Sequence, residues 1–112
     1  MKLFLAVRRL VSDTIPHDPH HPDYRLRGSL AKFRRTKGRG LPPRYRLFWV
    51  FSEKARVIIM LYINGPDSLR EQGGRKDPYV LFSGMLDRGE IGDSFEQNYR
   101  RWRRSDGAVG ER

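Results

Sequence analysis

The side chains of this sequence that could do chemistry are cations, and they gather on either side of a glycine- and proline-rich stretch, residues 38–43. Guanidinium groups form a rigid fork of donors that fits phosphate oxygens, and they stabilise the extra negative charge of a phosphoryl transition state. Residue types alone favour phosphate binding, with catalysis on a phosphodiester as the alternative. The cluster comprises Arg34, Arg35 and Lys37 before the stretch, Arg39 within it, and Arg44 and Arg46 after it.

The overall charge indicates an anionic partner. The chain of 112 residues holds 23 Lys and Arg against 13 Asp and Glu, a formal net charge of +10. With interleaved aromatic residues, this excess favours nucleic acid. A membrane-surface protein is the alternative, but no basic amphipathic helix is long enough for that role. The opening MKLFLAV is also too short for a signal peptide or a membrane span, so we expect no membrane partner.

Metal and cofactor sites have little support in the residues. The chain has no cysteine, which excludes disulfides and thiolate metal sites. His17, His20 and His21 could be metal ligands or an acid–base set, but they lie in a proline-broken loop without suitably placed carboxylates, which favours an exposed linker. There is no phosphate-binding glycine loop, no HExxH and no GxSxG. We expect neither a metal nor a cofactor.

The elements that must position the cations form one small α+β domain. Apolar spacing predicts a helix over residues 2–13, and the prolines that follow predict an extended loop over 14–24. Antiparallel strands are predicted near 32–37 and over 44–52 and 56–64, with a turn at 52–55. The last strand is apolar on both faces and is predicted to be central in the sheet. Pairing of the first two strands brings both basic groups to one end of the sheet.

Two helices are predicted after the sheet. Asp77 is the expected N-cap of the first, with Pro78 at its first position and Gly89 at its end. Its apolar stripe is expected to cover the sheet. The stripe consists of Tyr79, Phe82 and Leu86.

The last helix is expected to begin at a capping-box pattern formed by Asp93 and Glu96. Phe95, Tyr99 and Trp102 share one of its faces, and arginines surround them. Trp102 could stack on a nucleobase or lie in the core, and its position favours the core. The domain is expected to span residues 1–104, with a flexible C-terminal tail over 105–112.

One long stretch of motifs carries a family resemblance. It reads RGLPPRYRLFWVFSEKARVIIMLYIN and then SLREQGGRKDPYVLFSGMLDRG. Its pattern is YRLFF, a short turn, VII, an aromatic residue, N-x-x-x-[ST]-L-R and [TD]-x-Y-x-x-F-x-x-M-L-x-x-G. The match covers Arg34 to about Gly89, and the first helix and HHPDYRLRG also fit. The chain resembles the YhaV family of type II toxins, a branch of the RelE-like ribonucleases.

The resemblance implies the toxin of a type II toxin–antitoxin system. Such a toxin is a cytoplasmic endoribonuclease that cuts mRNA on the ribosome, contacts rRNA, and inhibits translation and growth. A PrlF-like antitoxin neutralises it, and the toxin–antitoxin complex can bind operator DNA through the antitoxin. The reaction is metal-independent, since in RelE-like enzymes the 2′-hydroxyl attacks the adjacent phosphate with Arg, Lys and Tyr in the catalytic roles. The implied fold is a small RelE-like domain with an antiparallel sheet of three or more strands, an N-terminal helix and C-terminal helices.

Carried over to this sequence, the motifs give catalytic roles to Arg35, Lys37, Arg46 and Tyr79. Arg35 stabilises the phosphorane or the leaving group, and Lys37 transfers a proton or neutralises charge. Arg46 and Tyr79 position the substrate. The expected RNA contacts are Arg34, Arg39, Arg44, Arg70, Arg100, Arg101, Arg103 and Arg104.

The chain departs from the family pattern in three places. Family members begin with a further strand and helix, so we expect a shortened N-terminus and an exposed sheet edge. Gly65 and Pro66 stand where acidic residues usually follow the asparagine, and Phe95 stands where tryptophan is usual. The alternatives are therefore a truncated, catalytically inactive relative that only binds RNA or antitoxin, and an unrelated basic RNA-binding domain.

Overall fold

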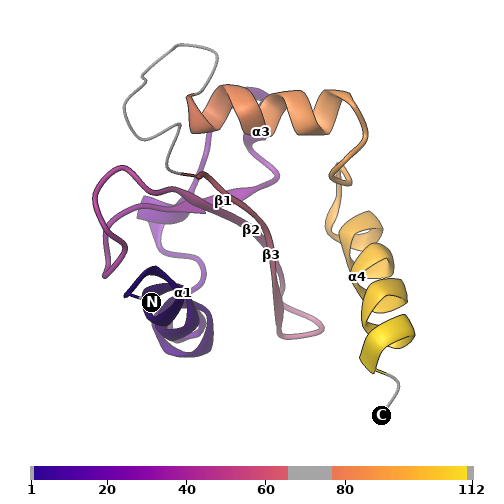
Figure 1. The fold of residues 1–112 in the computed structure, drawn as a ribbon, viewed down its shortest axis with the longest axis horizontal. Coiled ribbons are helices and arrows are strands. Elements are labelled where there is room, and N and C mark those ends of the chain that lie inside the picture. Colours follow the sequence, from indigo (N-terminus) through magenta and orange to yellow (C-terminus); the bar gives the residue numbers. More distant parts are fainter. Residues whose placement is uncertain (1, 66–76, 111–112) are drawn as a thin grey trace.

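The computed structural model describes residues 2–65 and 77–110, and the side chains of residues 3–65 and 77–103. A three-stranded antiparallel sheet follows an N-terminal helical segment and precedes two helices (Figure 1), which confirms the predicted α+β class. The helices are α1 (Lys2–Arg9), α2 (Ile15–His17), α3 (Pro78–Asp87) and α4 (Phe95–Gly110), and the strands are β1 (Arg34–Thr36), β2 (Leu47–Ser52) and β3 (Val57–Ile63). Short 3-10 turns occupy Pro22–Tyr24 and Gly28–Leu30.

The strand order is β1-β2-β3, so β2 is the central strand. The prediction that the strand over 56–64 is central was therefore wrong. Helices lie on both faces of the sheet (Figure 1), so even an edge strand buries apolar side chains on both sides. The continuous apolar sequence of β3 shows that both of its faces are covered, and it does not show whether strands pair with both of its edges. In the described part of the chain no strand pairs with the outer edge of β3, where Met60 is 50% exposed.

The N-terminal helical segment is longer than predicted and reaches His17. Between α1 and α2 the chain makes a π-helical turn over Leu10–Thr14. Pro16 lacks a backbone N–H, and in a regular α-helix its ring would clash with the carbonyl one turn earlier. A wider π turn just before the proline relieves that clash, and the chain stays helical where an extended loop was expected.

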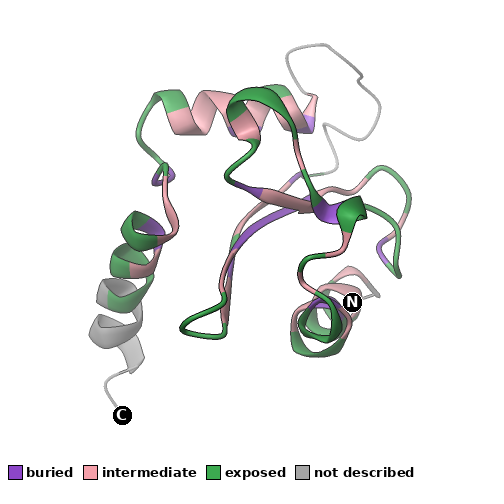
Figure 2. Ribbon diagram, turned by 180° about the vertical axis from the view of Figure 1, so that it is seen from behind, coloured by how far each residue is buried: buried purple, intermediate pink, exposed green. Residues whose placement is uncertain are grey.

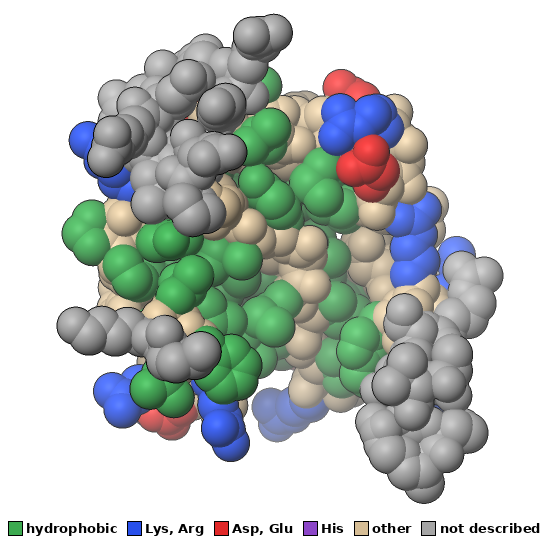
Figure 3. Space-filling view, in the orientation of Figure 1, with side chains coloured by type: hydrophobic (Ala, Val, Ile, Leu, Met, Phe, Trp, Pro, Cys, Tyr) green, Lys and Arg blue, Asp and Glu red, His purple; other side chains and the backbone are tan. Residues whose placement is uncertain are grey.

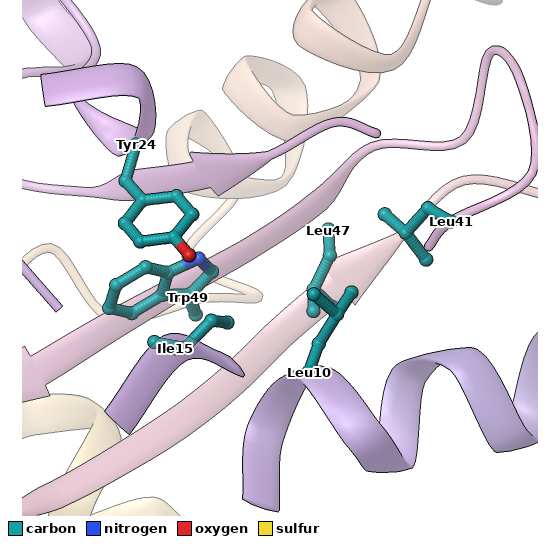
Figure 4. Packing of buried hydrophobic residues seen from close by; sticks show 6 residues of the cluster. All are labelled: Leu10, Ile15, Tyr24, Leu41, Leu47 and Trp49. Atoms are coloured by element: carbon teal, nitrogen blue, oxygen red, sulfur yellow. The ribbon is translucent and has the colours of Figure 1, made fainter. Parts of the chain in front are cut away.

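Alternate side chains of β2 enter two separate apolar clusters, one on each face of the sheet. On the sheet face that packs against α1, called the α1 face, Trp49 is fully buried against Tyr24 with ring centroids 5.2 Å apart. Figure 4 shows this cluster between the sheet and the N-terminal helices. Its buried members are Leu10, Ile15, Tyr24, Leu41, Leu47 and Trp49.

The opposite sheet face packs against α3 and is called the α3 face. Phe48 stacks on Phe82 of α3, with ring centroids 4.3 Å apart and an interplanar angle of 11°. The predicted stripe of α3 lies in this cluster, which confirms that the helix covers the sheet. The buried members are Phe33, Phe48, Val50, Ile59, Phe82 and Ile91, with Tyr79 and Leu86 packed beside them.

The helix starts follow local capping chemistry. Asp77 Oδ1 accepts a 2.8 Å hydrogen bond from the Tyr79 N–H, which confirms the predicted N-cap of α3. For α4 the predicted cap was one residue too early, because Ser94 Oγ rather than Asp93 accepts the Gln97 N–H, at 3.2 Å. Helix α4 runs to Gly110, into the segment predicted as a tail, and the flexibility of that segment stays a prediction.

The surface mixes an apolar face with a charged rim. Figure 2 shows exposed residues concentrated in the turns and the outer sides of the helices. Hydrophobic side chains gather over the middle of the face seen in Figure 3, with charged side chains at its edges. Within the described residues, no helix combines the length and the apolar character needed to cross a membrane.

Candidate active site

A cationic hollow of about 570 Å³ lies along the outer edge of β1. Residues 22–27 form its outer wall, and Arg25 bridges Arg34 of β1 in an antiparallel sense. β1 and the residue after it contribute Arg35 and Lys37, whose i, i+2 spacing places them on the same side of the strand. The hollow is lined by Pro22, Asp23, Arg25, Leu26, Arg27, Arg35 and Lys37.

Arg35 is held in this hollow by backbone carbonyls. Its Nη2 donates long hydrogen bonds to the carbonyl oxygens of Asp23, at 3.4 Å, and Arg25, at 3.5 Å. Its Nε is buried and has no hydrogen-bond partner in the protein. A buried polar atom without a partner is costly, so an anion that accepts from this guanidinium would be stabilised.

The carboxylate of Asp23, which lines the hollow, pairs with Arg39. The Asp23 carboxylate lies 3.1 Å from Arg39 Nη2 and 3.7 Å from His21 Nδ1. Arg39 also stacks over the Tyr24 ring, 5.1 Å from its centroid. The structure therefore places Arg39, a predicted RNA contact, in an ion pair beside the hollow rather than in its lining. The four cations of the hollow face one carboxylate that already has a partner.

Arg25 and Arg27 are part of this hollow, and the sequence analysis missed them. Both are exposed and lie on an extended segment, with φ and ψ of −75° and 142° at Arg25 and −118° and 169° at Arg27. Arginines two residues apart project from the same side of an extended chain. That spacing was the available signal, but nothing in the sequence showed that the segment runs beside β1.

The two other predicted catalytic residues lie outside the hollow. Arg46 Nη1 donates to the carbonyl of Tyr45 at 2.9 Å, and its backbone N–H donates to Asn64 Oδ1 at 2.7 Å. The last residue pair of β1 and β2 is Thr36 with Leu47, so Arg46 lies at the same end of the sheet as Lys37.

Tyr79 stands on the α3 face. Its ring packs edge-on against Phe48, with centroids 5.5 Å apart. Phe48 pairs with Arg35 in the sheet register. The sheet thus brings Arg35 and Lys37 into one hollow and leaves Arg46 and Tyr79 outside its lining.

Two further predicted RNA contacts have structural partners near the sheet. Arg34 is partly buried, and its Nη1 donates to the carbonyls of Ala31, at 3.3 Å, and Phe33, at 3.2 Å. Burial first, and the charge of Arg25 second, lower the pKa of Arg34 from its ordinary value. The Arg44 carbonyl accepts from Asn64 Nδ2 at 3.2 Å, and Arg44 adopts a positive φ of 72°.

The other predicted contacts belong to α4 or lie outside the described residues. Arg100, Arg101 and Arg103 are exposed on α4. Arg101 Nη2 donates to the carbonyl of Gly89 at 2.8 Å. Arg70 and the side chain of Arg104 are not among the described residues.

His17 is the last residue of α2, His20 and His21 lie in the loop that follows, and none of the three lines the cationic hollow. His21 Nδ1 accepts from the Asp23 N–H at 3.1 Å, and His20 Nε2 lies 3.5 Å from Glu53 Oε2. Among residues 2–65 and 77–110, no three His, Cys, Asp or Glu side chains form a group that could hold a metal ion. The hollow itself offers positive charge and directed N–H donors, the features that bind a phosphodiester.

Comparison with known proteins identifies the family. Residues 1–103 match the family model Toxin_YhaV, described as a toxin with endonuclease activity, of a toxin–antitoxin system. The chain belongs to the YhaV toxin family. This match confirms the resemblance drawn from the motifs, and it includes the N-terminal helix and the segment that forms the wall of the hollow.

Curated YhaV proteins support the same assignment. The chain is 38% identical over 94 residues to the ribonuclease toxin YhaV of Escherichia coli K12. The toxins YhaV of Escherichia coli O157:H7 and of strain CFT073 match to the same extent. Each match covers 79% of this chain and 59% of the relative, so the chain spans well under two thirds of these proteins. No solved structure matches the chain.

Proposed function

We propose that this chain is an endoribonuclease toxin that cuts RNA in the cationic hollow. The observation that carries the proposal is the grouping of Arg25, Arg27, Arg35 and Lys37 around one hollow in a YhaV family member. The lining of the hollow holds four cations and one carboxylate, and that carboxylate is paired with Arg39. The positive charge of the hollow is therefore not balanced within its lining. A ribose–phosphate backbone supplies the complementary charge.

The reaction proposed is attack of a ribose 2′-hydroxyl on the adjacent phosphorus. The 2′-O–P bond forms, the P–O5′ bond breaks, and the products are a 2′,3′-cyclic phosphate and a 5′-hydroxyl. The 2′-hydroxyl gives up its proton, and the leaving 5′-oxygen gains one. Electrostatic stabilisation of the pentacovalent phosphorane lowers the barrier, and this role suits the carbonyl-anchored guanidinium of Arg35.

The remaining cations have distinct proposed roles. Lys37 protonates the leaving oxygen or neutralises its charge, because it lines the hollow beside Arg35. Arg25 and Arg27, on the outer wall, hold the phosphates that flank the cleaved bond. Arg46 and Tyr79 position the nucleotides that leave the hollow along the end of the sheet.

The partners follow from the family. We propose that the substrate is mRNA on the ribosome, that rRNA meets the arginines of α4, and that cleavage stops translation in the cytoplasm. A PrlF-like antitoxin is proposed to neutralise the toxin and to carry the complex to operator DNA. The net charge of +10 supports acidic partners of this kind.

Induced expression in bacteria tests the proposal. The intact chain should arrest growth and shorten cellular mRNA, and Arg35→Ala should abolish both while the protein stays soluble. Arg8→Ala is the matched control, since it removes an exposed arginine from α1 without touching the hollow. If the intact chain leaves growth and mRNA unchanged while the purified protein is folded and binds RNA, the chain is a binding-only relative.

The finer claims have separate tests. Purified protein should cleave RNA in the presence of EDTA, and added ribosomes should raise the rate on mRNA. Co-expression of the neighbouring antitoxin gene should restore growth. Loss of cleavage in EDTA would overturn metal independence, and equal rates with and without ribosomes would overturn ribosome dependence.

A further inference from the structure

Three aromatic rings form a stacked row along α4. Phe95 and Tyr99 have ring centroids 5.6 Å apart at an interplanar angle of 15°, and Tyr99 and Trp102 have centroids 5.8 Å apart at 25°. Their spacing of four and three residues puts them on one helix face. The shared face predicted for these three residues is therefore confirmed.

The row begins in the core and ends in solvent. Phe95 and Tyr99 pack against the apolar cluster of the α3 face, whereas Trp102 is 45% exposed. The preference for a core Trp102 was therefore wrong.

Positive charge surrounds the exposed end of the row. Arg100, Arg101 and Arg103 flank Trp102 in sequence and are exposed. The guanidinium of Arg103 lies 5.8 Å from the centroid of the Tyr99 ring, so a cation sits beside the stacked row. Proteins that bind single-stranded nucleic acid combine stacking rings with flanking cations in this way.

We propose that Trp102 is a stacking platform for an unpaired nucleobase of the RNA, with Arg100 and Arg103 neutralising the adjacent phosphates. The rings of Phe95, Tyr99 and Trp102 are nearly parallel, and the indole of Trp102 is the last ring of the row. A nucleobase, which is also flat, could stack on that indole. The flanking arginines suit a base attached to phosphates. The choice of RNA as the ligand rests on the proposed function, but the platform is separate from the cationic hollow and can be tested without cleavage.

Tryptophan fluorescence gives a direct test on the intact protein. The chain has two tryptophans, of which Trp49 is fully buried and Trp102 is exposed. The probe is a 2′-O-methyl oligoadenylate, which cannot be cleaved because its attacking hydroxyl is blocked. We expect the probe to quench the emission of the wild-type protein and to leave that of Trp102→Phe, which reports Trp49 alone, unchanged. Unchanged emission of the wild-type protein at saturating probe would overturn the proposal.

Binding measurements on variants supply the second test. Trp102→Ala should weaken oligoadenylate binding by about 5- to 150-fold, the range for loss of one stacked base, while Trp102→Phe should keep most of the affinity. The slope of log K against log salt should stay unchanged in Trp102→Ala and should fall in Arg100→Ala, because only the latter removes a phosphate contact. Phe4→Ala on α1 is the matched control, since it truncates another exposed aromatic residue.

The outcomes separate this proposal from the proposed function. Arg35→Ala should lose cleavage and keep the quenching, so failure of the catalytic hollow leaves the platform standing. Equal affinities of wild type and Trp102→Ala would refute the platform even if the chain cleaves RNA. Loss of antitoxin binding alone in Trp102→Ala would refute it too and would assign this face to a protein partner. Far-UV circular dichroism of each variant shows that the comparison is between folded proteins.

Discussion

At the scale of single residues, Arg35 differs from the other cations that line the hollow, because backbone carbonyls hold its guanidinium. Its Nη2 is tied to two carbonyls, while its Nε is buried without a protein partner. Lys37, Arg25 and Arg27 are exposed around it. Preorganised donors are worth more in catalysis than mobile ones, since they do not reorganise as charge develops. This difference separates the proposed catalytic arginine from the positioning ones.

The outer wall of the hollow should contribute phosphate contacts. We expect Arg27→Ala to weaken binding of single-stranded RNA and to reduce the slope of log K against log salt by about 0.7, the value for one phosphate on a single strand. Fluorescence anisotropy of an end-labelled 2′-O-methyl oligonucleotide at several salt concentrations measures that slope. Arg9→Ala, on the exposed side of α1, is the control. An equal change in both variants would mean that the charge acts diffusely and that the wall has no special role.

The sequence identified part of this site. Arg35 and Lys37 were singled out by the family motif, and the basic strand that carries them could be predicted from the residues. Arg25 and Arg27 could not, because their position depends on the bridge between Arg25 and Arg34, a contact between a loop and a strand edge. Charge alone also could not separate Arg39, which pairs with Asp23, from the cations that line the hollow.

At the scale of elements, β1 is only three residues long and needs an anchor to hold Arg35 and Lys37. Thr36 provides it, since its buried Oγ1 accepts a 3.0 Å hydrogen bond from Trp49 Nε1 on β2. The alternation of the strand turns Thr36 into the core and its two neighbours away from it. This buried side-chain hydrogen bond adds to the backbone pairing that joins β1 to β2.

We expect Thr36→Val to lower the free energy of unfolding by about 1–3 kcal/mol, because it leaves the buried indole N–H without an acceptor. Urea denaturation measures the change. Trp49→Phe removes the donor, so the double variant should be more stable than the sum of the two single effects predicts. Strict additivity in this cycle would show that the hydrogen bond does not anchor the strand.

The first turn of α3 gives a second prediction. Asp77→Ala removes the acceptor for the Tyr79 N–H and should lower the free energy of unfolding by about 1 kcal/mol. Asp87→Ala is the control from the other end of the same helix, where a carboxylate is unfavourable to the helix dipole. Thermal or urea unfolding compares the two, and equal losses would argue against a capping role.

Local chemistry explains which elements the sequence could predict. The cap at Asp77 and the apolar stripe of α3 arise from neighbouring residues and were confirmed. The central position of β2 and the helical path through Pro16 were not foreseen. Strand order depends on pairing between distant segments. The proline at position 16 was expected to end the helix, whereas the π turn before it lets the chain stay helical.

At the scale of the whole molecule, the net charge of +10 should make RNA binding strongly salt-dependent. If the hollow contacts four phosphates, the expected slope on single-stranded RNA is about −2.8, and the affinity should fall by about 50-fold between 50 and 200 mM salt. Anisotropy titrations over this range give the slope directly. A slope near zero would contradict a site built on phosphate contacts.

The central claim is that the hollow holds the scissile phosphate against Arg35. Single-turnover cleavage of a defined RNA oligonucleotide tests it most directly, with the wild type, Arg35→Ala and the control Arg8→Ala compared at saturating enzyme. We expect Arg35→Ala to lose about 10²- to 10³-fold in rate, as for removal of one donor aimed at developing charge, and Arg8→Ala to match the wild type. A folded Arg35→Ala protein that cleaves at the wild-type rate would contradict the claim.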